Sequence, residues 1–212
     1  MIRVLLADDH HLVRAGMKSL LEKSLDIRVV AEASDGLEAV TQFKALRPDV
    51  VILDISMPNM DGLEAAKYIL SIDQSAAILI LTMYPEKQYA VRAIRAGALG
   101  YITKSASTSE LHAAVRNVAV KKRFLLEEGV DALSAGLSSG KAGAGPVDSL
   151  SDRELQVLRL IARGRKVKEI SQELDVRTKT VETYRSRILR KLGLRNNAEL
   201  CRFAFENALL DG

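Results

Sequence analysis

The stretch VVILDISMPNMDG (residues 50–62) opens with four apolar residues and places an acid, Asp54, where the apolar run stops. Such a run is typical of a strand that is buried on both faces of a parallel sheet. Four similar runs and five amphipathic segments alternate along the first half of the chain. The further runs cover residues 2–7, 28–33, 77–82 and 100–104, and the helical patterns lie near residues 11–24, 36–46, 62–71, 86–96 and 108–120. The alternation predicts an α/β fold, a doubly wound five-stranded parallel sheet covered by helices.

The second half of the chain differs from the first in composition and in its hydrophobic pattern. Residues 127–149 are rich in Gly, Ser and Ala, which is linker composition, with room for a short helix near 128–135. From residue 150 onward the pattern is purely helical. We therefore predict three parts: a domain over residues 1–123, a linker over 124–147, and a second, smaller all-α domain over 148–212.

The all-α part has clear helix signals. Ser151-x-x-Glu154 is a capping box that begins a first helix, which Gly164 ends. A second helix is expected over about 167–174, a third from near Thr178 to Gly193, and a fourth from about 197. Because only a few residues join the second helix to the third, the pair is typical of a helix-turn-helix.

Composition and charge narrow the class of protein. The 212 residues are 48% hydrophobic and 27% charged, which indicates a globular core. Residues 150–212 hold 14 Lys and Arg against 9 Asp and Glu, a net +5, which favours an anionic partner, nucleic acid first. The single cysteine, Cys201, excludes an internal disulfide. No apolar run reaches the roughly 18 residues of a membrane span, so we expect a cytoplasmic protein without a membrane partner.

Polar residues stand at the carboxyl ends of four predicted strands. Asp8 and Asp9 follow the first strand, Asp54 ends the third, Thr82 ends the fourth and Lys104 ends the fifth. Ligands of doubly wound sheets bind at this edge. Three neighbouring carboxylates repel one another, and Mg²⁺, which prefers oxygen ligands, would offset the repulsion. A carboxylate can attack phosphorus to form an acyl phosphate, while an ammonium and a hydroxyl stabilise the transferred group.

Other chemistries fit these residues poorly. Position 56 is Ser, so the chain lacks the Asp-x-Asp pair of phosphatases that use an aspartate nucleophile. His10, His11 and His112 lack zinc-ligand spacing. His10 and His11 are instead expected to start a helix at the rim of the site, without a catalytic role. No Walker A sequence is present.

The first domain resembles a response-regulator receiver domain, a flavodoxin-like fold. The matching motifs are ADDHHLVRAG (7–16), DISMPNMDG (54–62), LT (81–82) and GYITK (100–104). The resemblance implies that Asp54 accepts a phosphoryl group from a sensor histidine kinase, and that Asp8, Asp9, Asp54 and the main-chain carbonyl of Ser56 bind Mg²⁺. It also implies that Thr82 and Tyr101 form a switch pair and that Lys104 pairs with the phosphate. Ser105 stands where many receivers have Pro.

The predicted third helix of the all-α part carries a polar stripe. At 100° per residue, Val181 and Ile188 face the preceding helix, as do Tyr184 and Leu192. The opposite side suits the major groove of DNA, where cations bond guanine edges or phosphates and Glu can accept from cytosine. That stripe consists of Lys179, Thr183, Ser186 and Arg190, and it is flanked by Glu182 and Arg187. Further expected phosphate contacts are Arg185, Arg177, Lys166 and Lys168.

The segment LSDRELQVLRLIARGRKVKEISQELDVRTKTVETYRSRILRKLGL (150–194) resembles the LuxR-type helix-turn-helix domain. Together with the receiver, the chain is similar to the NarL/FixJ-type response regulators, and KVKEIS with KTVETYR to the GacA/UvrY branch. Val167 stands where Asn is frequent and Tyr184 where His is frequent. The resemblance implies a two-component regulator of transcription, not an enzyme on a separate substrate. Its only catalysis would be its own Mg²⁺-dependent phosphorylation and dephosphorylation.

The same resemblance implies how the two parts communicate. In the inactive form the receiver covers the recognition helix, and phosphorylation releases it and leads to a homodimer on promoter DNA. Leu200, Phe203, Ala204 and Ala208 of the last helix are a candidate dimer face, or else part of the core of the domain. Two alternatives remain: a constitutive DNA-binding protein with the receiver as a scaffold, and a relay that passes the phosphoryl group onward. The cognate kinase, the signal, the promoters and the sign of regulation do not follow from the sequence.

Overall fold

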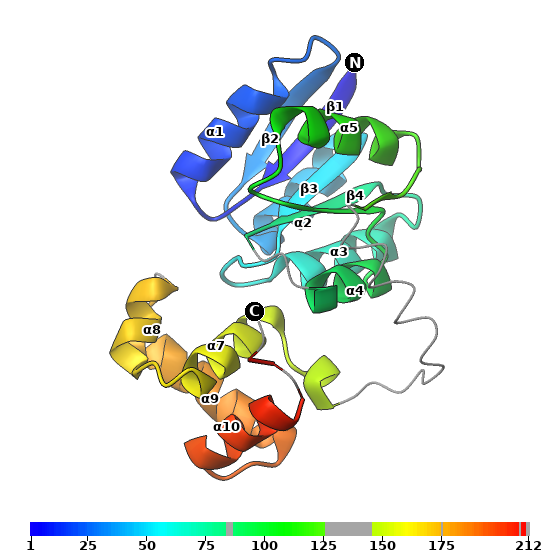
Figure 1. Ribbon diagram of the computed structural model, residues 1–212. Coiled ribbons are helices and arrows are strands. Elements are labelled where there is room, and N and C mark those ends of the chain that lie inside the picture. The colour runs from blue at the N-terminus through cyan, green and yellow to red at the C-terminus, as the bar shows by residue number, and fades with distance from the viewer. Residues whose placement is uncertain (84–86, 126–145, 175, 208, 211–212) are drawn as a thin grey trace. The chain divides into compact units, whose positions relative to one another are not determined.

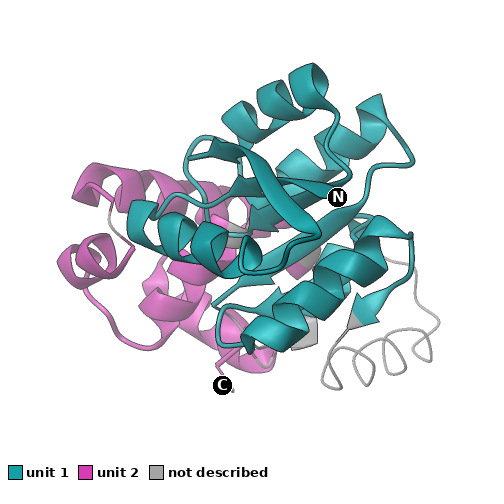
Figure 2. Ribbon diagram, turned by 90° about the horizontal axis from the view of Figure 1, so that it is seen from above, with its two compact units in different colours: residues 1–140 teal, residues 141–212 magenta. Residues whose placement is uncertain are grey.

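A computed structural model describes residues 1–83, 87–125, 146–174, 176–207 and 209–210. The chain divides into two compact units, residues 1–140 and 141–212, coloured separately in Figure 2. The helix expected near 128–135 lies outside the described residues. Within the part of the chain that is described, no helix has both the length and the apolar character needed to cross a membrane.

Unit 1 is built on a parallel sheet with the strand order β2-β1-β3-β4-β5-β6. The strands are β1 (Ile2–Ala7), β2 (Ile27–Ala33), β3 (Val50–Asp54), β4 (Ile78–Thr82), β5 (Gly100–Thr103) and β6 (Phe124–Leu125). The five expected strands are confirmed. The sixth was not expected, and its two residues fall in the segment that the sequence assigned to the linker. Two residues are too few to carry a periodic pattern, so nothing in the sequence marked them.

Helices cover both faces of this sheet (Figure 1). Helices α1 and α5 lie on one face, and α2, α3 and α4 lie on the other. Their bounds are α1 (His11–Leu21), α2 (Gly36–Leu46), α3 (Gly62–Ile72), α4 (Lys87–Arg95) and α5 (Thr108–Ala119). The arrangement is that of a doubly wound α/β fold, and it leaves the carboxyl ends of the strands open to a ligand.

The core explains why the central strands β3 and β4 are apolar up to their last residue. Val4, Leu6, Val50 and Ile52 are fully buried between the sheet and the helices α1 and α5. Strands in the middle of a parallel sheet contact helices on both faces, so apolar residues follow one another instead of alternating with polar ones. A polar residue within or next to such a strand therefore needs a local reason, and Asp54, which ends β3 with 3% of its surface exposed, is the clearest case.

Unit 2 is entirely helical in its described part. Its elements are the 3₁₀ turn η1 (Pro146–Ser149) and the helices α7 (Asp152–Ala162), α8 (Val167–Glu173), α9 (Thr178–Leu192) and α10 (Asn197–Glu206). Helix α9 contacts both α7 and α8, and α10 packs on α7. The predicted capping box of Ser151 and Glu154 is present. Gly193 ends α9 in the left-handed conformation, with φ 66°.

The structure decides one alternative that the sequence left open in this unit. Leu200 and Ala204 of α10 are fully buried, and α10 packs on α7, so these two side chains belong to the core of the unit and not to a free dimer face. Phe203 is half-buried, and Ala208 lies outside the described residues. Phe205, on the same helix, is 78% exposed.

Candidate functional site

The strand register brings together the polar residues predicted at the carboxyl ends of the strands of unit 1, here called the rim of the sheet. They are Asp8, Asp9, Asp54, Thr82 and Lys104. Ala7 of β1 pairs with Leu53 of β3, so Asp8 and Asp54 both lie one residue further along. On the other side, Thr82 of β4 pairs with Thr103 of β5, and Lys104 follows directly. The backbone N–H of Lys104 donates to the carbonyl of Thr82 at 2.6 Å. The carboxylates, the hydroxyl and the ammonium thus come from the ends of four neighbouring strands.

An ammonium group bridges two of the carboxylates. Lys104 Nζ lies 2.7 Å from Asp8 Oδ2 and 2.9 Å from Asp54 Oδ2. The side chains of the two acids are almost inaccessible to solvent, and that of Lys104 is 7% exposed. Charges that are taken out of water need partners of opposite sign close by, and this bridge supplies them.

The bridge leaves a surplus of negative charge. Burial raises the pKa of Asp54, Lys104 works against that rise, and the nearby carboxylate of Asp8 adds to it. Burial also opposes the charge on Lys104, but Asp54 and Asp8 outweigh it and raise the pKa of that ammonium. Among the described residues, Asp54 Oδ1 is buried without a hydrogen-bond partner. A further cation would relieve both the repulsion and this unsatisfied oxygen.

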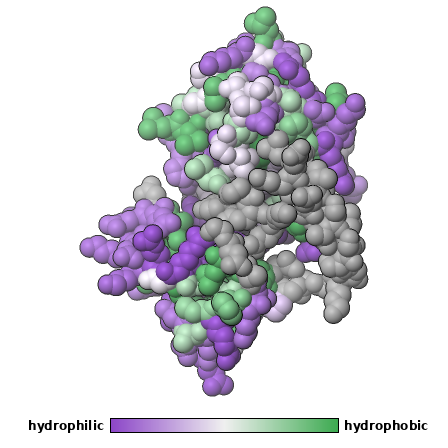
Figure 3. Space-filling view, in the orientation of Figure 1, coloured by the Kyte–Doolittle hydropathy of each residue, from purple (hydrophilic) through white to green (hydrophobic). Residues whose placement is uncertain are grey.

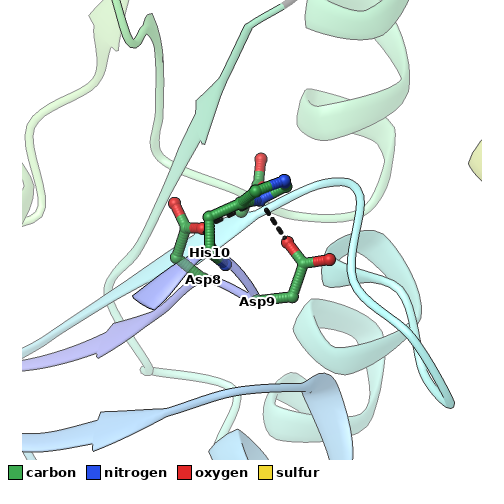
Figure 4. A group of neighbouring side chains, drawn as sticks. Asp8, Asp9 and His10 are labelled. Atoms are coloured by element: carbon green, nitrogen blue, oxygen red, sulfur yellow. Dashed lines mark hydrogen bonds and ion pairs between the residues drawn. The ribbon is translucent and has the colours of Figure 1, made fainter. Parts of the chain in front are cut away.

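A group of donors for such a cation is already assembled. Asp8, Asp9, His10 and Asp54 each place one ligand atom within 4.8 Å of the others, the only group of this kind found among the described residues. Figure 4 shows the His10 ring beside both Asp8 and Asp9. His10 Nδ1 lies 2.8 Å from Asp9 Oδ1 and 3.5 Å from Asp8 Oδ1. Three carboxylates of this kind fit Mg²⁺, which binds oxygen ligands.

The loop after Asp54 is held at two points. Asn59 adopts φ 61°, and its side-chain amide donates to Asp35 Oδ2 at 2.6 Å. Gly62 begins α3 so close to β3 that an added Cβ would overlap the carbonyl oxygen of Asp54. The loop also contains Ser56, which is buried. These contacts fix the backbone that follows the candidate phosphoacceptor.

The remaining predicted residues of the rim are buried as well. Thr82 is fully buried at the end of β4, and Tyr101, on β5, is 5% exposed. Tyr101 pairs with Ile80 in the sheet, two residues before the level of Thr82. The structure thus places the ring of Tyr101 inside the unit and on the strand next to the one that carries Thr82.

The predicted polar stripe on α9 is exposed to solvent. Its four members and the two flanking residues, Glu182 and Arg187, are exposed, while Val181 and Ile188 on the other side of the helix are fully buried. The hydroxyls of Thr183 and Ser186 donate to backbone carbonyls one turn earlier, at 2.9 Å each. Their oxygens still have lone pairs that can accept a bond from a nucleic acid.

The flanking cations fall into two groups. Lys166 and Lys168, at the start of α8, are exposed, and Figure 3 shows hydrophilic side chains over that helix. The backbone N–H of Lys166 donates to Glu169 Oε2 at 2.9 Å, which fixes the start of α8. Arg185, in contrast, is only half-exposed, and its Nε donates to Asn197 Oδ1 of α10 at 2.6 Å. Arg185 is therefore tied to the domain itself, apart from the stripe.

Comparison with known proteins identifies a family for each of the two units. Residues 4–116 match the family described as "Response regulator receiver domain", and residues 148–204 match "Bacterial regulatory proteins, luxR family". The chain belongs to the two-component response regulators. The receiver therefore stands before a LuxR-type DNA-binding domain, as the sequence motifs predicted.

The relatives of this response regulator span its full length. "Response regulator UvrY" of Escherichia coli K12 is 38% identical over 209 residues, which cover 99% of this chain and 96% of UvrY. "Transcriptional regulatory protein LiaR" of Bacillus subtilis is also 38% identical, over the whole of both chains. A structure of RcsB from Salmonella enterica serovar Typhimurium, described as bound to promoter rprA in the presence of phosphomimetic BeF3-, matches with TM-score 0.58 and 28% identity, covering 95% of this chain and 97% of RcsB.

The sequence did not predict two features of the rim in this regulator. The first is the bond between Asn59 and Asp35, for which the tolerance of Asn for the left-handed conformation was the available signal. The second is the position of His10, which was expected only to start a helix. It does cap α1, but its side chain makes no capping hydrogen bond and turns to the carboxylates instead.

Proposed function

We propose that Asp54 is the phosphoacceptor of this response regulator and that its phosphorylation controls how α9 binds promoter DNA. One observation carries the proposal. Asp54 is a buried carboxylate with a raised pKa, one oxygen bonded to Lys104 and the other without a partner among the described residues. That second oxygen is the available nucleophile.

The transfer follows from these groups. An oxygen of Asp54 attacks the phosphorus of a phosphohistidine on a sensor histidine kinase, the P–N bond breaks, and an aspartyl phosphate forms. Lys104, already 2.9 Å from Asp54, balances the charge on the transferred group. Attack by water on the phosphorus would break the bond to Asp54, release inorganic phosphate and return the free carboxylate. The regulator therefore acts only on itself and has no separate substrate.

The three carboxylates support a Mg²⁺ site. Asp8, Asp9 and Asp54 would hold the ion, together with the main-chain carbonyl of Ser56, whose residue is buried in the adjacent loop. When bound, Mg²⁺ supplies positive charge to the phosphoryl oxygens. Lys104 and the metal are expected to act together, because neither one alone neutralises three acids and a phosphoryl group.

Thr82 and Tyr101 would form the switch that changes conformation on phosphorylation. The Thr82 hydroxyl would bond a phosphoryl oxygen, and the ring of Tyr101 would follow the space that Thr82 leaves. The burial of both residues on neighbouring strands supports this coupling. Phosphorylation adds close to two negative charges and can shift only an equilibrium between two states.

The LuxR-type unit would use the α9 stripe to read the major groove. Lys179, Arg187 and Arg190 would contact guanine edges or phosphates, and Glu182 would accept from cytosine. Thr183 and Ser186 would contribute contacts from the same face, while Lys166 and Lys168 would bind phosphates. Because RcsB is described as binding DNA as dimers, we expect the phosphorylated protein to bind as a homodimer in the cytoplasm.

The test is labelling with acetyl phosphate in the presence of Mg²⁺, followed by intact-mass measurement. The wild type should gain the mass of one phosphoryl group, and Asp54→Asn should gain none. Asp49→Asn is the matched control, because Asp49 is an exposed acid directly before the same strand. Normal labelling of Asp54→Asn would refute the site.

The same samples test the coupling to DNA. A duplex selected from a random pool by the labelled protein should bind the labelled wild type more tightly than the unlabelled one, and Asp54→Asn should bind as the unlabelled wild type does. Equal binding with and without label would favour a constitutive DNA-binding protein. Transfer of the label to a second protein without any change in DNA binding would favour a relay.

A further inference from the structure

We propose that the imidazole of His10 is a ligand in the rim metal site and gives this site a preference for borderline transition ions such as Ni²⁺ and Co²⁺ over Mg²⁺. The inference rests on the proposed function only for the existence of a divalent-ion site. It goes beyond that function by naming a nitrogen donor and the ion selectivity that follows from it.

The position of His10 supports a ligand role. Its Nδ1 lies within 3.5 Å of one oxygen of Asp8 and 2.8 Å from one oxygen of Asp9. Two donors that each lie about 2.1 Å from one ion are at most about 4.2 Å apart, so the imidazole is already within reach of an ion shared with both acids. The group extends to Asp54, whose Oδ1 is buried without a hydrogen-bond partner among the described residues.

The local backbone holds His10 there. Its N–H donates to Asp8 Oδ1 at 2.8 Å, and an Arg14 guanidinium nitrogen donates to the carbonyl of Asp8 at 2.5 Å. Although His10 occupies the N-cap of α1, its side chain makes no capping hydrogen bond. The ring is therefore not needed by the helix. It is more than half exposed, so it can turn without disturbing the core.

The donor set decides which ions are favoured. Carboxylate oxygens suit Mg²⁺ and Mn²⁺, whereas an imidazole nitrogen suits Ni²⁺, Zn²⁺ and Cu²⁺. A site of oxygens alone would follow the general affinity order of the metals, and a nitrogen ligand widens the gap in favour of the later ions. His11, next in the sequence, is exposed and takes no part in the donor group, so it serves as the matched control.

The experiment is calorimetric titration of the full-length, unphosphorylated protein with Mg²⁺ and, separately, with Ni²⁺. His10→Ala should weaken Ni²⁺ binding by about 10- to 100-fold and change Mg²⁺ binding by less than about threefold. His11→Ala should bind both ions as the wild type does. If His10 only orients Asp9, both ions should weaken by the same factor, and that result would overturn the proposal.

A spectroscopic readout makes the test independent of affinity. Pulsed electron paramagnetic resonance of the Mn²⁺-loaded wild type should show nitrogen-14 coupling, which should persist in His11→Ala and disappear in His10→Ala. Wild-type protein without such coupling would contradict the nitrogen ligand. Asp9→Asn separates this failure from a failure of the proposed function: if that change leaves Mg²⁺ and Ni²⁺ binding intact, the divalent site itself is not at the rim.

Discussion

Asp54 combines two properties that oppose each other, full burial and a charge. Burial raises its pKa above the usual 3.8, and the carboxylate of Asp8 adds to the rise that Lys104 only partly offsets. This carboxylate is therefore kept where its charge destabilises the folded protein, a cost that Lys104 alone does not remove. Such a conflict is common at sites selected for function instead of stability.

This conflict has a measurable pH dependence. An acid with a raised pKa contributes stability that is present below its usual pKa and lost as the pH rises through the raised value, by about 1.4 kcal/mol for each pH unit between the two pKa values. Asp54→Asn, which stays neutral, should therefore unfold at a higher temperature than the wild type at pH 7.5 in chelator, and the difference should shrink as the pH falls towards 4.

Thermal unfolding between pH 4.5 and 8 checks this expectation. Adding Mg²⁺ should stabilise the wild type more than Asp54→Asn, because a ligand stabilises the state that binds it. Asp49→Asn controls for the loss of an exposed charge next to the same strand. A lower unfolding temperature for Asp54→Asn at pH 7.5 would show that its pairing with Lys104 outweighs the cost of burial.

At the scale of single elements, the loop between β3 and α3 depends on the absence of one side chain. A Cβ at Gly62 would overlap the carbonyl of Asp54, so Gly62→Ala should destabilise the receiver by about 1–3 kcal/mol and lower the rate of phosphorylation. Gly16, in α1, has nothing within 4 Å of its Cβ position. Gly16→Ala should therefore stabilise the protein by about 0.5–1 kcal/mol. Denaturant unfolding of the two variants measures both effects, and equal signs would contradict the steric explanation.

Two capping boxes offer a second comparison between elements. Glu154 closes the box of α7 and also lies 2.6 Å from Lys191 of α9, whereas Glu110 closes the box of α5 and is exposed to solvent around its carboxylate. Glu154→Ala should cost about 1.5–3 kcal/mol, since it removes a cap and a charged bond between two helices. Glu110→Ala should cost less.

Hydrogen exchange on the full chain resolves the two helices. Glu154→Ala should lower the protection of amides in α7 and α9 together, because one side chain links the two. Glu110→Ala should affect α5 alone. Loss of protection in α7 without any change in α9 would show that the bond to Lys191 contributes nothing.

How far the sequence predicts each element depends on the length of the pattern. Strand β3 and helix α9 were found because continuous burial and a long apolar stripe repeat over many residues. Helix α1 was expected to reach residue 24, but it ends at Leu21, and the chain then turns so that the N–H of Ile27 donates to the carbonyl of Ser24. Turns of this kind depend on single hydrogen bonds, which leave no period in a sequence.

The residues of the candidate site also divide into those that a sequence pattern predicts and those that depend on single contacts. The position of Asp54 at a strand end marks it as a rim residue. The orientation of His10 depends on which nearby group its ring bonds, and no spacing in the sequence specifies that.

At the scale of the whole molecule, we expect charged residues of α9 to affect DNA binding without affecting phosphorylation of the receiver. Lys179→Ala and Arg187→Ala should each weaken DNA binding and lower the slope of log affinity against log salt by about 1, since each removes one phosphate or base contact. Glu182→Ala should instead relax the base preference at one position of the site. Phosphorylation of Asp54 should be normal in all three variants.

Fluorescence anisotropy over a range of salt concentrations measures these slopes. Arg116→Ala is the control of equal charge, because Arg116 belongs to the receiver and pairs with Asp26 at 2.8 Å. If Arg116→Ala changed the slope as much as Lys179→Ala, the effect would reflect the net charge of the protein and not a contact of α9.

The short strand β6 matters for anyone who expresses the receiver alone. Its backbone pairs with Gly100 and Tyr101 and so covers one border of the sheet. A fragment cut at residue 123, the domain end expected from the sequence, would expose peptide groups of β5 to a second molecule, and such borders promote aggregation. A fragment that retains Phe124 and Leu125 keeps that border covered and should give the more soluble, monodisperse preparation.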